Sequence, residues 1–487
     1  MIDITAKIHD KFSIEFKVGF LTRRKLKKNS FSVNTWLFAP NSLDINPLTY
    51  TKNLFYRDVK SYIRLITPVF LLREIAEDDS HPIRSLEKSF HEAASNPTRT
   101  SLREYEYQIK MFSAIFKSAL RNEAHHILHN SIEEDMNYLV SSYVQNVKNI
   151  LEKYRHLRRI INVPTLSPEI LDYYFFGDEF ISNIAEQRTC FLIETFQAKE
   201  DERYKKAVAC LSSLWENEIK YRKEKEYITV EKESPTKNKE YVFRRSILKK
   251  YIESDLFLRA RRKKDGVFIE QIYYSIAAGL SMIFATAIAF SFQMKYGNFT
   301  MPLFVALVIS YMLKDRIKEL MRYYFAHKLG SKYFDNKTEI AIKDAIIGWS
   351  KNGMDFITEE KVPREVMEIR SRSSLLEAEN RIADEKIILY RKLVSIDREK
   401  IDENSEYLIA GINDIMRFHL SRFMQKMDNP EEALYYRNEE GKVMVVQGKK
   451  VYYLNVIMQL QFEEQVSYKR FRVVFTQTGI VDLEELK

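Results

Sequence analysis

Cysteine and glycine are scarce in this sequence: the chain has two cysteines and twelve glycines among 487 residues. Cys190 and Cys210 are too few for a disulfide framework, and no cluster resembles a metal knuckle, so we expect buried thiols in a reducing compartment. So few glycines leave little material for phosphate-binding loops, and there is no P-loop, nucleophile elbow or dinucleotide fingerprint. The sequence therefore predicts no catalytic residue and no cofactor, and gives no positive sign of an enzyme.

Formal charge is absent from two long runs, although charged residues make up 30% of the chain. Residues 272–294 are 23 uncharged residues, which as a helix would be about 35 Å long, against about 30 Å for a bilayer core. Residues 296–313 are a second run of 18, about 27 Å long as a helix. Only Lys295 separates the runs, and Gly297 and Asn298 favour a turn. The pattern predicts two transmembrane helices, at about 271–294 and 296–313, joined as an antiparallel hairpin.

The net charge of +9 is concentrated beside these runs. The basic residues Arg261, Arg262, Lys263 and Lys264 precede the first run, and others follow the second. Because basic residues are retained on the cytoplasmic side, we expect a bacterial inner-membrane protein with both termini cytoplasmic. The alternative is a hairpin buried in a soluble core. The lack of charge inside either run argues against a coupled transporter.

The first run also carries a stripe of small residues within one helical arc of about 160°. Apolar helices in lipid associate through close packing of such residues. This face either packs against the second helix or forms a self-association surface whose hydroxyl groups line a narrow pore, and one helix in an oligomer can do both. The residues of the stripe are Ser275, Ala278, Gly279, Ser281, Ala285, Thr286 and Ala289.

Residues 12–20 and 31–37 alternate apolar and polar side chains, which predicts two half-buried strands. The loop between them is either a solvated hairpin tip or, like the basic segment before the first run, a contact for phosphates or anionic headgroups. Its basic residues are Arg23, Arg24, Lys25, Lys27 and Lys28.

Helical patterns dominate the next 220 or so residues. We expect an amphipathic helix ending before Pro68, longer helices across about 101–160 and 168–226, and a helix at 241–263 that continues into the first membrane span. Near the C-terminus, a helix is expected from Pro363 and strands at about 452–462 and 471–475. The N-terminal strands could join these C-terminal strands in one sheet.

The predicted fold class is an α+β membrane protein. It has a mainly helical cytoplasmic domain, a two-helix transmembrane hairpin and a C-terminal mixed α/β part with antiparallel strands. The predicted divisions are an N-terminal β-hairpin (1–43), a helical cytoplasmic domain (44–265), the transmembrane hairpin with its stalk (266–330) and a C-terminal α+β cytoplasmic domain (331–487).

One segment carries residues of the kinds that bind metals. His125, His129 and Glu133 recur every four residues and would share one face of a helix. The metalloprotease motif, however, needs a glutamate directly after the first histidine, and His126 stands there. A polar helix face is the preferred interpretation, so no metal site is predicted.

In outline the chain resembles the two-span membrane effectors of bacterial anti-phage defence systems, through its layout and not through a shared motif. The resemblance implies a homo-oligomer that binds a cytoplasmic ligand, such as a nucleotide or oligonucleotide, and then opens a gated pore or ion channel. One hairpin cannot enclose a pore, so about three or more copies would be needed. The implied partners are membrane lipid, further copies of the chain and a partner protein of the same system. The alternative is a non-conducting, membrane-tethered scaffold or sensor that binds a protein partner.

Overall fold

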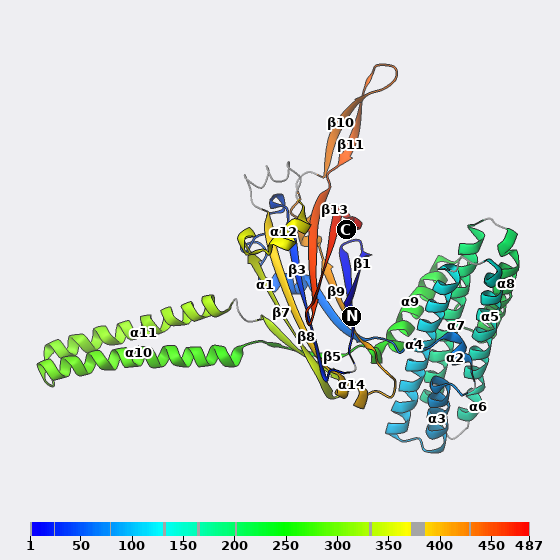
Figure 1. Ribbon diagram of the computed structural model, residues 1–487, viewed down its shortest axis with the longest axis horizontal. Helices are drawn as coiled ribbons and strands as arrows, with labels where there is room; N and C mark the ends of the chain where they lie inside the picture. The colour runs from blue at the N-terminus through cyan, green and yellow to red at the C-terminus, as the bar shows by residue number, and fades with distance from the viewer. Residues whose placement is uncertain are drawn as a thin grey trace. The chain divides into compact units, whose positions relative to one another are not determined.

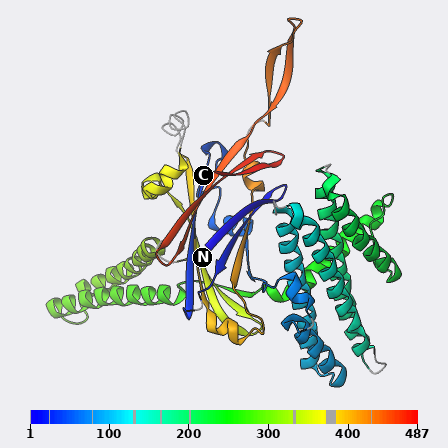
Figure 2. The ribbon, with the colours of Figure 1, turned by 45° about the vertical axis from the view of Figure 1, so that its right-hand side comes forward.

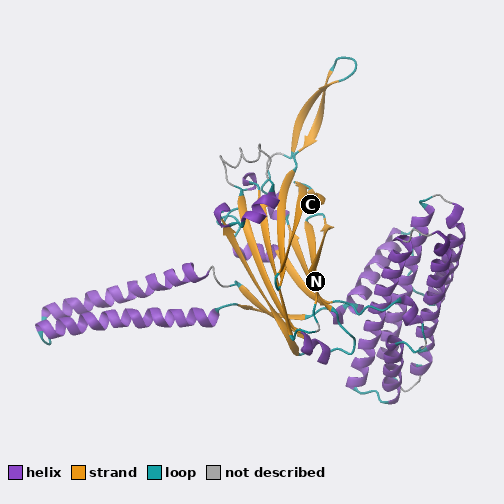
Figure 3. Ribbon diagram, viewed as in Figure 1, coloured by secondary structure: helices purple, strands orange, loops and turns teal. Residues whose placement is uncertain are grey.

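The computed structural model describes residues 2–486 except 24, 78, 130–132, 163–165, 200–201, 331–333, 372–384 and 428–429. The chain divides into two compact units. Unit 1 comprises Met1–Arg64, Leu258–Glu406 and Gly411–Lys487, and unit 2 comprises Leu65–Phe257 and Tyr407–Ala410. Strands gather in unit 1 and long helices in unit 2, apart from one helical pair that belongs to unit 1 (Figure 1, Figure 3).

Unit 1 is built around an eight-stranded antiparallel sheet in the order β14-β13-β12-β3-β8-β7-β6-β5. Its strands are β3 (Lys28–Ala39), β5 (Arg259–Lys264), β6 (Asn336–Ile342), β7 (Ala345–Ile357), β8 (Lys386–Asp397), β12 (Tyr452–Phe462), β13 (Gln465–Thr476) and β14 (Gly479–Leu486). A four-stranded sheet in the order β1-β2-β9-β4 contains β1 (Ile2–Asp10), β2 (Ser13–Leu21), β4 (Val59–Leu65) and β9 (Gly411–His419). A separate two-stranded sheet contains β10 (Glu431–Arg437) and β11 (Val443–Lys449).

Aromatic side chains hold the two larger sheets together face to face. The ring of Phe20 on β2 lies 4.4 Å from that of Phe31 on β3 and 5.1 Å from that of Phe462 on β12. Phe16 and Phe471 repeat this contact at 5.5 Å. Alternation along each strand puts these rings on one face, and burial of such large apolar side chains is the main stabilising contribution to the unit.

The other face of the large sheet is partly covered by α12 (Arg364–Arg370). Val362 and Val366 pack there on Trp36, Phe38 and Ile457. The remaining short helices of unit 1 are α1 (Lys52–Asp58), α14 (Arg398–Glu403) and α15 (Ser421–Met424). Beyond them, unit 1 contains the long helices α10 (Val267–Tyr296) and α11 (Met301–Gly330).

Unit 2 is a bundle of helices: α2 (Leu72–Ala76), α3 (His81–Ser95), α4 (Arg99–His129), α5 (Glu133–His156), α6 (Arg158–Ile161), α7 (Pro168–Gln197), α8 (Lys205–Glu224) and α9 (Pro235–Ile252). Its core contains a polar network around the fully buried Asp178. That carboxylate accepts hydrogen bonds from the hydroxyls of Tyr221 and Tyr227, each at 2.8 Å, while Arg155 donates to Asp178 and, through two nitrogens, to Glu218. Buried polar groups need such partners, so the network fixes how α5, α7 and α8 pack.

The structure confirms several sequence predictions for strands and helices. The alternating N-terminal and C-terminal segments are strands, and β3 pairs with β12, so the N-terminal strands do join the C-terminal sheet. The helix expected before Pro68 is wrong in its second half, because that half is strand β4. The helix expected at 241–263 is also wrong: α9 ends at Ile252, and Arg259–Lys264 is the edge strand β5.

The predicted fold class is wrong. Within the described residues only α10 is long and apolar enough to cross a membrane, so the two-helix transmembrane hairpin is overturned. The protein is a mixed α/β structure dominated by a large antiparallel sheet that gathers strands from both ends of the chain. The error arose because Tyr296–Leu313 was treated as one helix, whereas α11 begins only at Met301.

Candidate membrane-binding site

Helix α10 exposes an apolar surface over most of its length. The helix begins after Gly266 and ends before Gly297, whose φ values of 71° and 74° are the left-handed conformation that glycine adopts without strain. Phe268 is 77% exposed, and Ile283 and Phe290 are also largely exposed. The candidate span is Glu270–Tyr296, 27 residues. Apolar side chains this exposed over a whole helix indicate an interaction site.

Helix α11 is apolar only in its first part. From Met301 to Leu313 it has 13 residues without charge, which span about 20 Å. Lys314, Asp315 and Arg316 follow at once. A bilayer core is about 30 Å thick, so this segment is too short to cross it.

The two helices pack side by side in antiparallel orientation (Figure 1, Figure 2). The hydroxyl of Ser310 donates a hydrogen bond to the backbone oxygen of Ala285 at 3.2 Å, and the guanidinium of Arg322 lies 4.9 Å from the ring of Tyr274. In this register the first charged residue of α11, Lys314, lies beside the α10 residues near Ser281. The apolar end of the pair, whose one charged residue is Lys295, is therefore limited by α11 to a depth of about 20 Å.

The stripe of small residues divides between the two sides of α10. Ser281 is buried against α11, and Ala285 contacts Ser310, while Gly279 is exposed and an added Cβ there would meet no atom within 4 Å. Ala278, Thr286 and Ala289 are half-buried, and Ser275 is exposed. A role for the exposed members in self-association or pore lining stays a prediction.

The hydroxyl groups of the stripe are already satisfied within the helix. Ser275 donates to the backbone oxygen of Gln271 at 2.9 Å, Ser281 to that of Ala278 at 2.8 Å and Thr286 to that of Met282 at 2.8 Å. Such internal hydrogen bonds lower the cost of placing a hydroxyl in hydrocarbon.

The turn that joins the helices presents the most exposed apolar side chains of the pair. Phe299 is fully exposed and Met294 is 88% exposed. Two polar contacts stabilise the turn: the amide of Gly297 donates to the backbone oxygen of Gln293 at 3.0 Å, and the Gln293 side chain donates to Asn298 at 2.8 Å. The buried hydroxyl of Thr300 has no hydrogen-bond partner among the described groups. The exposed apolar side chains of the tip suit insertion into hydrocarbon.

At its other end the helical pair is fixed to the large sheet. The chain leaves the sheet after Lys264 and returns at Asn336, which are directly paired residues of β5 and β6. The amide of Asp265 donates to the backbone oxygen of Asp335 at 3.3 Å, and the Asp265 carboxylate pairs with Lys351 at 2.9 Å.

Helix α1 holds Asp335 from a second direction. The ammonium of Lys52 lies 2.8 Å from the Asp335 carboxylate and the Tyr56 hydroxyl donates to it at 2.7 Å. Burial opposes the charge of Lys52, but hydrogen bonds to Asp335 and Asp355 outweigh it and raise the pKa of Lys52. These residues were not found from the sequence because their contacts join segments almost 300 positions apart.

Many of the basic residues singled out in the sequence have acidic partners. Arg261 lies on the exposed edge strand β5, Lys263 pairs with Glu339 at 3.0 Å, and Lys264 pairs with Glu270 at 2.8 Å. The guanidinium of Arg262 lies 4.6 Å from the ring of Tyr56. The edge strand is therefore less positive than its sequence indicates, although β5 remains exposed throughout.

The basic loop between β2 and β3 is similarly compensated. Arg23 pairs with Glu463 at 2.7 Å and Lys27 pairs with Glu399 at 2.5 Å. Lys25 is exposed, and Arg24 lies outside the described residues. Contact of this loop with phosphates or headgroups stays a prediction.

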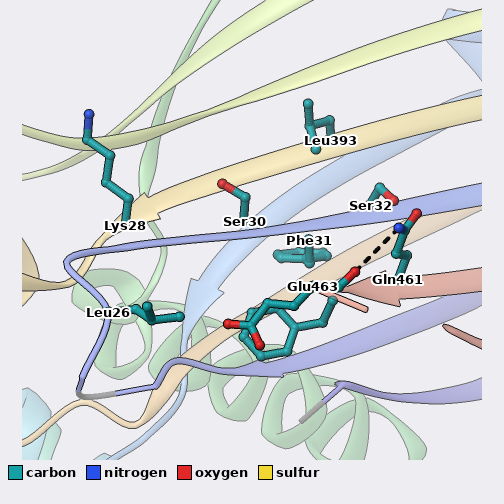
Figure 4. Close-up of a pocket in the computed structure, with 9 residues that line it drawn as sticks. Leu26, Lys28, Ser30, Phe31, Ser32, Leu393, Gln461 and Glu463 are labelled. Carbon is teal, nitrogen blue, oxygen red and sulfur yellow. Dashed lines mark hydrogen bonds between the residues drawn. The ribbon is translucent and has the colours of Figure 1, made fainter. Parts of the chain in front are cut away.

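A groove of 420 Å³ lies beside this loop. Figure 4 shows Lys28 at one end, Gln461 at the other and Glu463 between them, with Gln461 donating to the backbone oxygen of Glu463 at 3.4 Å. Arg23 already pairs with the Glu463 carboxylate, which leaves Lys28 as the one lining cation without an acid partner among the described groups. One lysine beside serine and glutamine side chains does not define a ligand class.

The histidine segment does not form a continuous helix face. Helix α4 ends at His129, and Glu133 is the first residue of α5. The rings of His125 and His129 stack at 3.8 Å, and Nδ1 of His129 donates to the backbone oxygen of His125 at 2.9 Å. In the described part of the chain, no three histidine, cysteine or carboxylate side chains cluster as metal ligands would.

Comparison with known proteins finds no matching family model, no similar curated protein and no similar solved structure.

Proposed function

We propose that this protein is tethered to a membrane by inserting the tip of the α10–α11 pair into the bilayer from one side. The observation that carries the proposal is the apolar end of the pair, about 20 Å deep, with Phe299 and Met294 fully or almost fully exposed at its tip. One leaflet contributes about 15 Å of hydrocarbon. The depth of the apolar end therefore exceeds one leaflet and falls short of the whole bilayer.

The charges that bound this end favour the same depth. Lys314, Arg316 and Lys318 would lie at the level of the headgroups, where lysine and arginine attract anionic lipids by about 1 kcal/mol each. The single charge at the tip is Lys295, which costs up to about 3 kcal/mol at the membrane centre and less where its long side chain reaches a polar layer.

Both large parts of the chain lie on the same side of the membrane in this proposal. Both termini would then be cytoplasmic, with the protein bound to the inner leaflet of a bacterial inner membrane. The function closest to this geometry is the non-conducting, membrane-tethered scaffold or sensor. A gated pore, a nucleotide ligand and a role in anti-phage defence stay predictions from the sequence.

Flotation with liposomes tests the tether. The full chain is expected to float with vesicles, and Phe299→Asp together with Met294→Asp is expected to abolish flotation. Each change removes about 2 kcal/mol of apolar burial and adds about 3 kcal/mol for a buried carboxylate. Phe268→Asp is the control, since Phe268 is also apolar and is 77% exposed but lies at the opposite end of α10, outside the proposed depth. Equal loss with the control would refute tip insertion.

A fluorophore at position 298 tests the depth. A cysteine there, in a chain with Cys190→Ser and Cys210→Ser, is labelled with a quenchable dye and bound to vesicles. One-sided insertion predicts protection from a membrane-impermeant quencher added outside or trapped inside. Quenching from inside would show that the pair spans the bilayer, and quenching from outside would show that the tip is not inserted. Either result overturns the proposal. Leakage of a dye trapped inside the vesicles would also overturn it, because it would show that the bound protein forms a pore.

A further inference from the structure

The two-stranded sheet β10–β11, called the arm below, is almost wholly exposed in unit 1. All of its 14 strand residues but Gly448 are exposed. Its two strands pair only with each other within the described residues, and Figure 2 shows the arm clear of the other strands. An isolated two-stranded hairpin is marginally stable in water, so an arm of this kind needs a covering surface.

The two faces of the arm differ. The register pairs Tyr436 with Met444 and Leu434 with Val446, so these four side chains lie together on one face, which we call the apolar face. Each is between 42% and 54% exposed. The opposite face carries Tyr435, Val443 and Val445, which are 53% to 72% exposed. It also carries charged residues near both ends, including Glu431, which pairs in register with Lys449. Both faces are apolar at their centre, but the apolar face has two directly paired rows of large apolar side chains and the opposite face has one.

Charge at the two ends of the apolar face is self-complementary. Glu432 lies on this face near the base of the arm, and Lys442 lies on it at the tip, opposite Asn438. No ion pair to either residue is found in the described part of the chain. When two arms stack face to face in antiparallel orientation, Glu432 of each meets Lys442 of the other. Lys450, at the base, then faces the tip residues Glu439 and Glu440 of the second arm.

We propose that the apolar face of the arm is the contact between two copies of this chain, related by a two-fold axis. Such an isologous contact buries the same four side chains from each copy and closes on itself. The four side chains supply roughly 250 Å² per copy, about a third of the roughly 800 Å² that a stable interface buries on each side. The dimer is therefore reversible and forms at high local concentration, as on a membrane surface.

Sedimentation of the full chain in detergent micelles, over a wide range of concentration, tests this contact. Glu432→Lys and Lys442→Glu are each expected to raise the dissociation constant roughly tenfold, because the two-fold axis repeats the change and one exposed ion pair contributes a factor of about two to five. The double variant, in which both charges are exchanged, is expected to restore association. Tyr436→Ser is expected to abolish it.

Glu431→Lys is the control, since it changes the net charge equally but lies on the opposite face. The proposal is overturned if the chain stays monomeric, or if the apolar-face variants leave the dissociation constant of the dimer unchanged. It is also overturned if the control weakens the dimer equally, or if the double variant with exchanged charges does not restore association. The inference does not depend on membrane insertion: flotation of every arm variant is expected to match the unchanged chain. Loss of flotation alone would bear on the tether and not on the arm.

Discussion

Gly177 allows a close helix contact in unit 2, and replacing it with alanine should destabilise that unit. A Cβ at this position of α7 would lie 2.1 Å from the hydroxyl oxygen of Tyr154 and 2.7 Å from Cγ2 of Ile109. Tyr154 is fully buried, stacks on Tyr174 with ring centroids 5.2 Å apart, and donates a hydrogen bond to the backbone oxygen of Tyr174 at 3.0 Å. The ring therefore cannot give way without losing these contacts.

The expected loss for Gly177→Ala follows from three contributions. Overpacking a close-packed core costs about 1–3 kcal/mol, and a lost buried hydrogen bond costs about 1 kcal/mol. Alanine in place of glycine inside a helix returns about 1 kcal/mol. The net expectation is a decrease of about 2 kcal/mol in the free energy of unfolding of unit 2.

Urea titration followed by circular dichroism at the helical minimum measures this change. Gly279→Ala on α10 is the control: the same substitution in a helix, with no atom within 4 Å of the new Cβ, should leave stability unchanged or slightly raised. Tyr154→Phe removes the clashing oxygen, so the double variant Gly177→Ala with Tyr154→Phe should lose about 1 kcal/mol less than the sum of the single losses. A stable Gly177→Ala chain, or additive losses, would refute the packing argument.

Three further predictions concern buried or paired ionisable groups. Lys392 and Asp414, 4% and 3% exposed, form a buried ion pair with Nζ 2.6 Å from Oδ1. Lys392→Met should lower the free energy of unfolding, measured by urea titration, by about 3–5 kcal/mol. Adding Asp414→Leu should recover most of that loss, and failure to recover it would indicate a local packing defect instead. Burial raises the pKa of the Cys190 thiol to about 11, so in Cys210→Ser protein its alkylation should be slow at neutral pH and rise about tenfold per pH unit until near that value; a plateau near pH 8.5 would contradict this. Burial opposes ionisation of Glu15, but hydrogen bonds from Arg417 and a neighbouring lysine outweigh it and lower its pKa below the ordinary 4.5; its contribution to stability is therefore full above that pH and lost as pH falls through the lowered pKa, and Glu15→Gln should flatten this acid dependence in thermal melts, whereas an unchanged acid limb would exclude the role.

Period-two alternation predicted four of the strands that lie on the core: β2, β3, β12 and β13. Phe16 and Phe20 lie on the buried face of β2, and Phe471 lies on the buried face of β13. Because one face of each strand is buried, apolar and polar residues alternate along the sequence. Strands β8 and β9 also have buried residues but were not predicted, and strands without a buried face were missed as well. Arg259–Lys264 is six residues of which five are basic, and it is a strand only because β6 pairs with it along its whole length.

The length of α11 was misjudged for a local reason. Residues 297–300 have no charge, so composition cannot distinguish them from helix. In the structure Gly297 and Phe299 both have positive φ, at 74° and 59°, and the turn between the helices takes up residues that composition had assigned to the second span. Pro302 lies in the first turn of α11, where a missing amide hydrogen costs little, and marks its true start. The contacts of Asp335 with α1 are set by tertiary structure alone and left no sequence signal.

The edges of the sheets in unit 1 differ in a way that bears on assembly. An exposed edge strand invites pairing with other chains, and natural proteins counter this with charged side chains, above all lysine. Strand β5 does so, with five basic residues in six and no apolar residue larger than alanine. The arm does the opposite, because half of its strand residues are large, exposed apolar side chains, on strands with no further partner among the described residues. Since the same chain protects one edge and leaves the other apolar, the exposure of the arm is better explained by a surface that covers it than by tolerance of an unprotected hairpin.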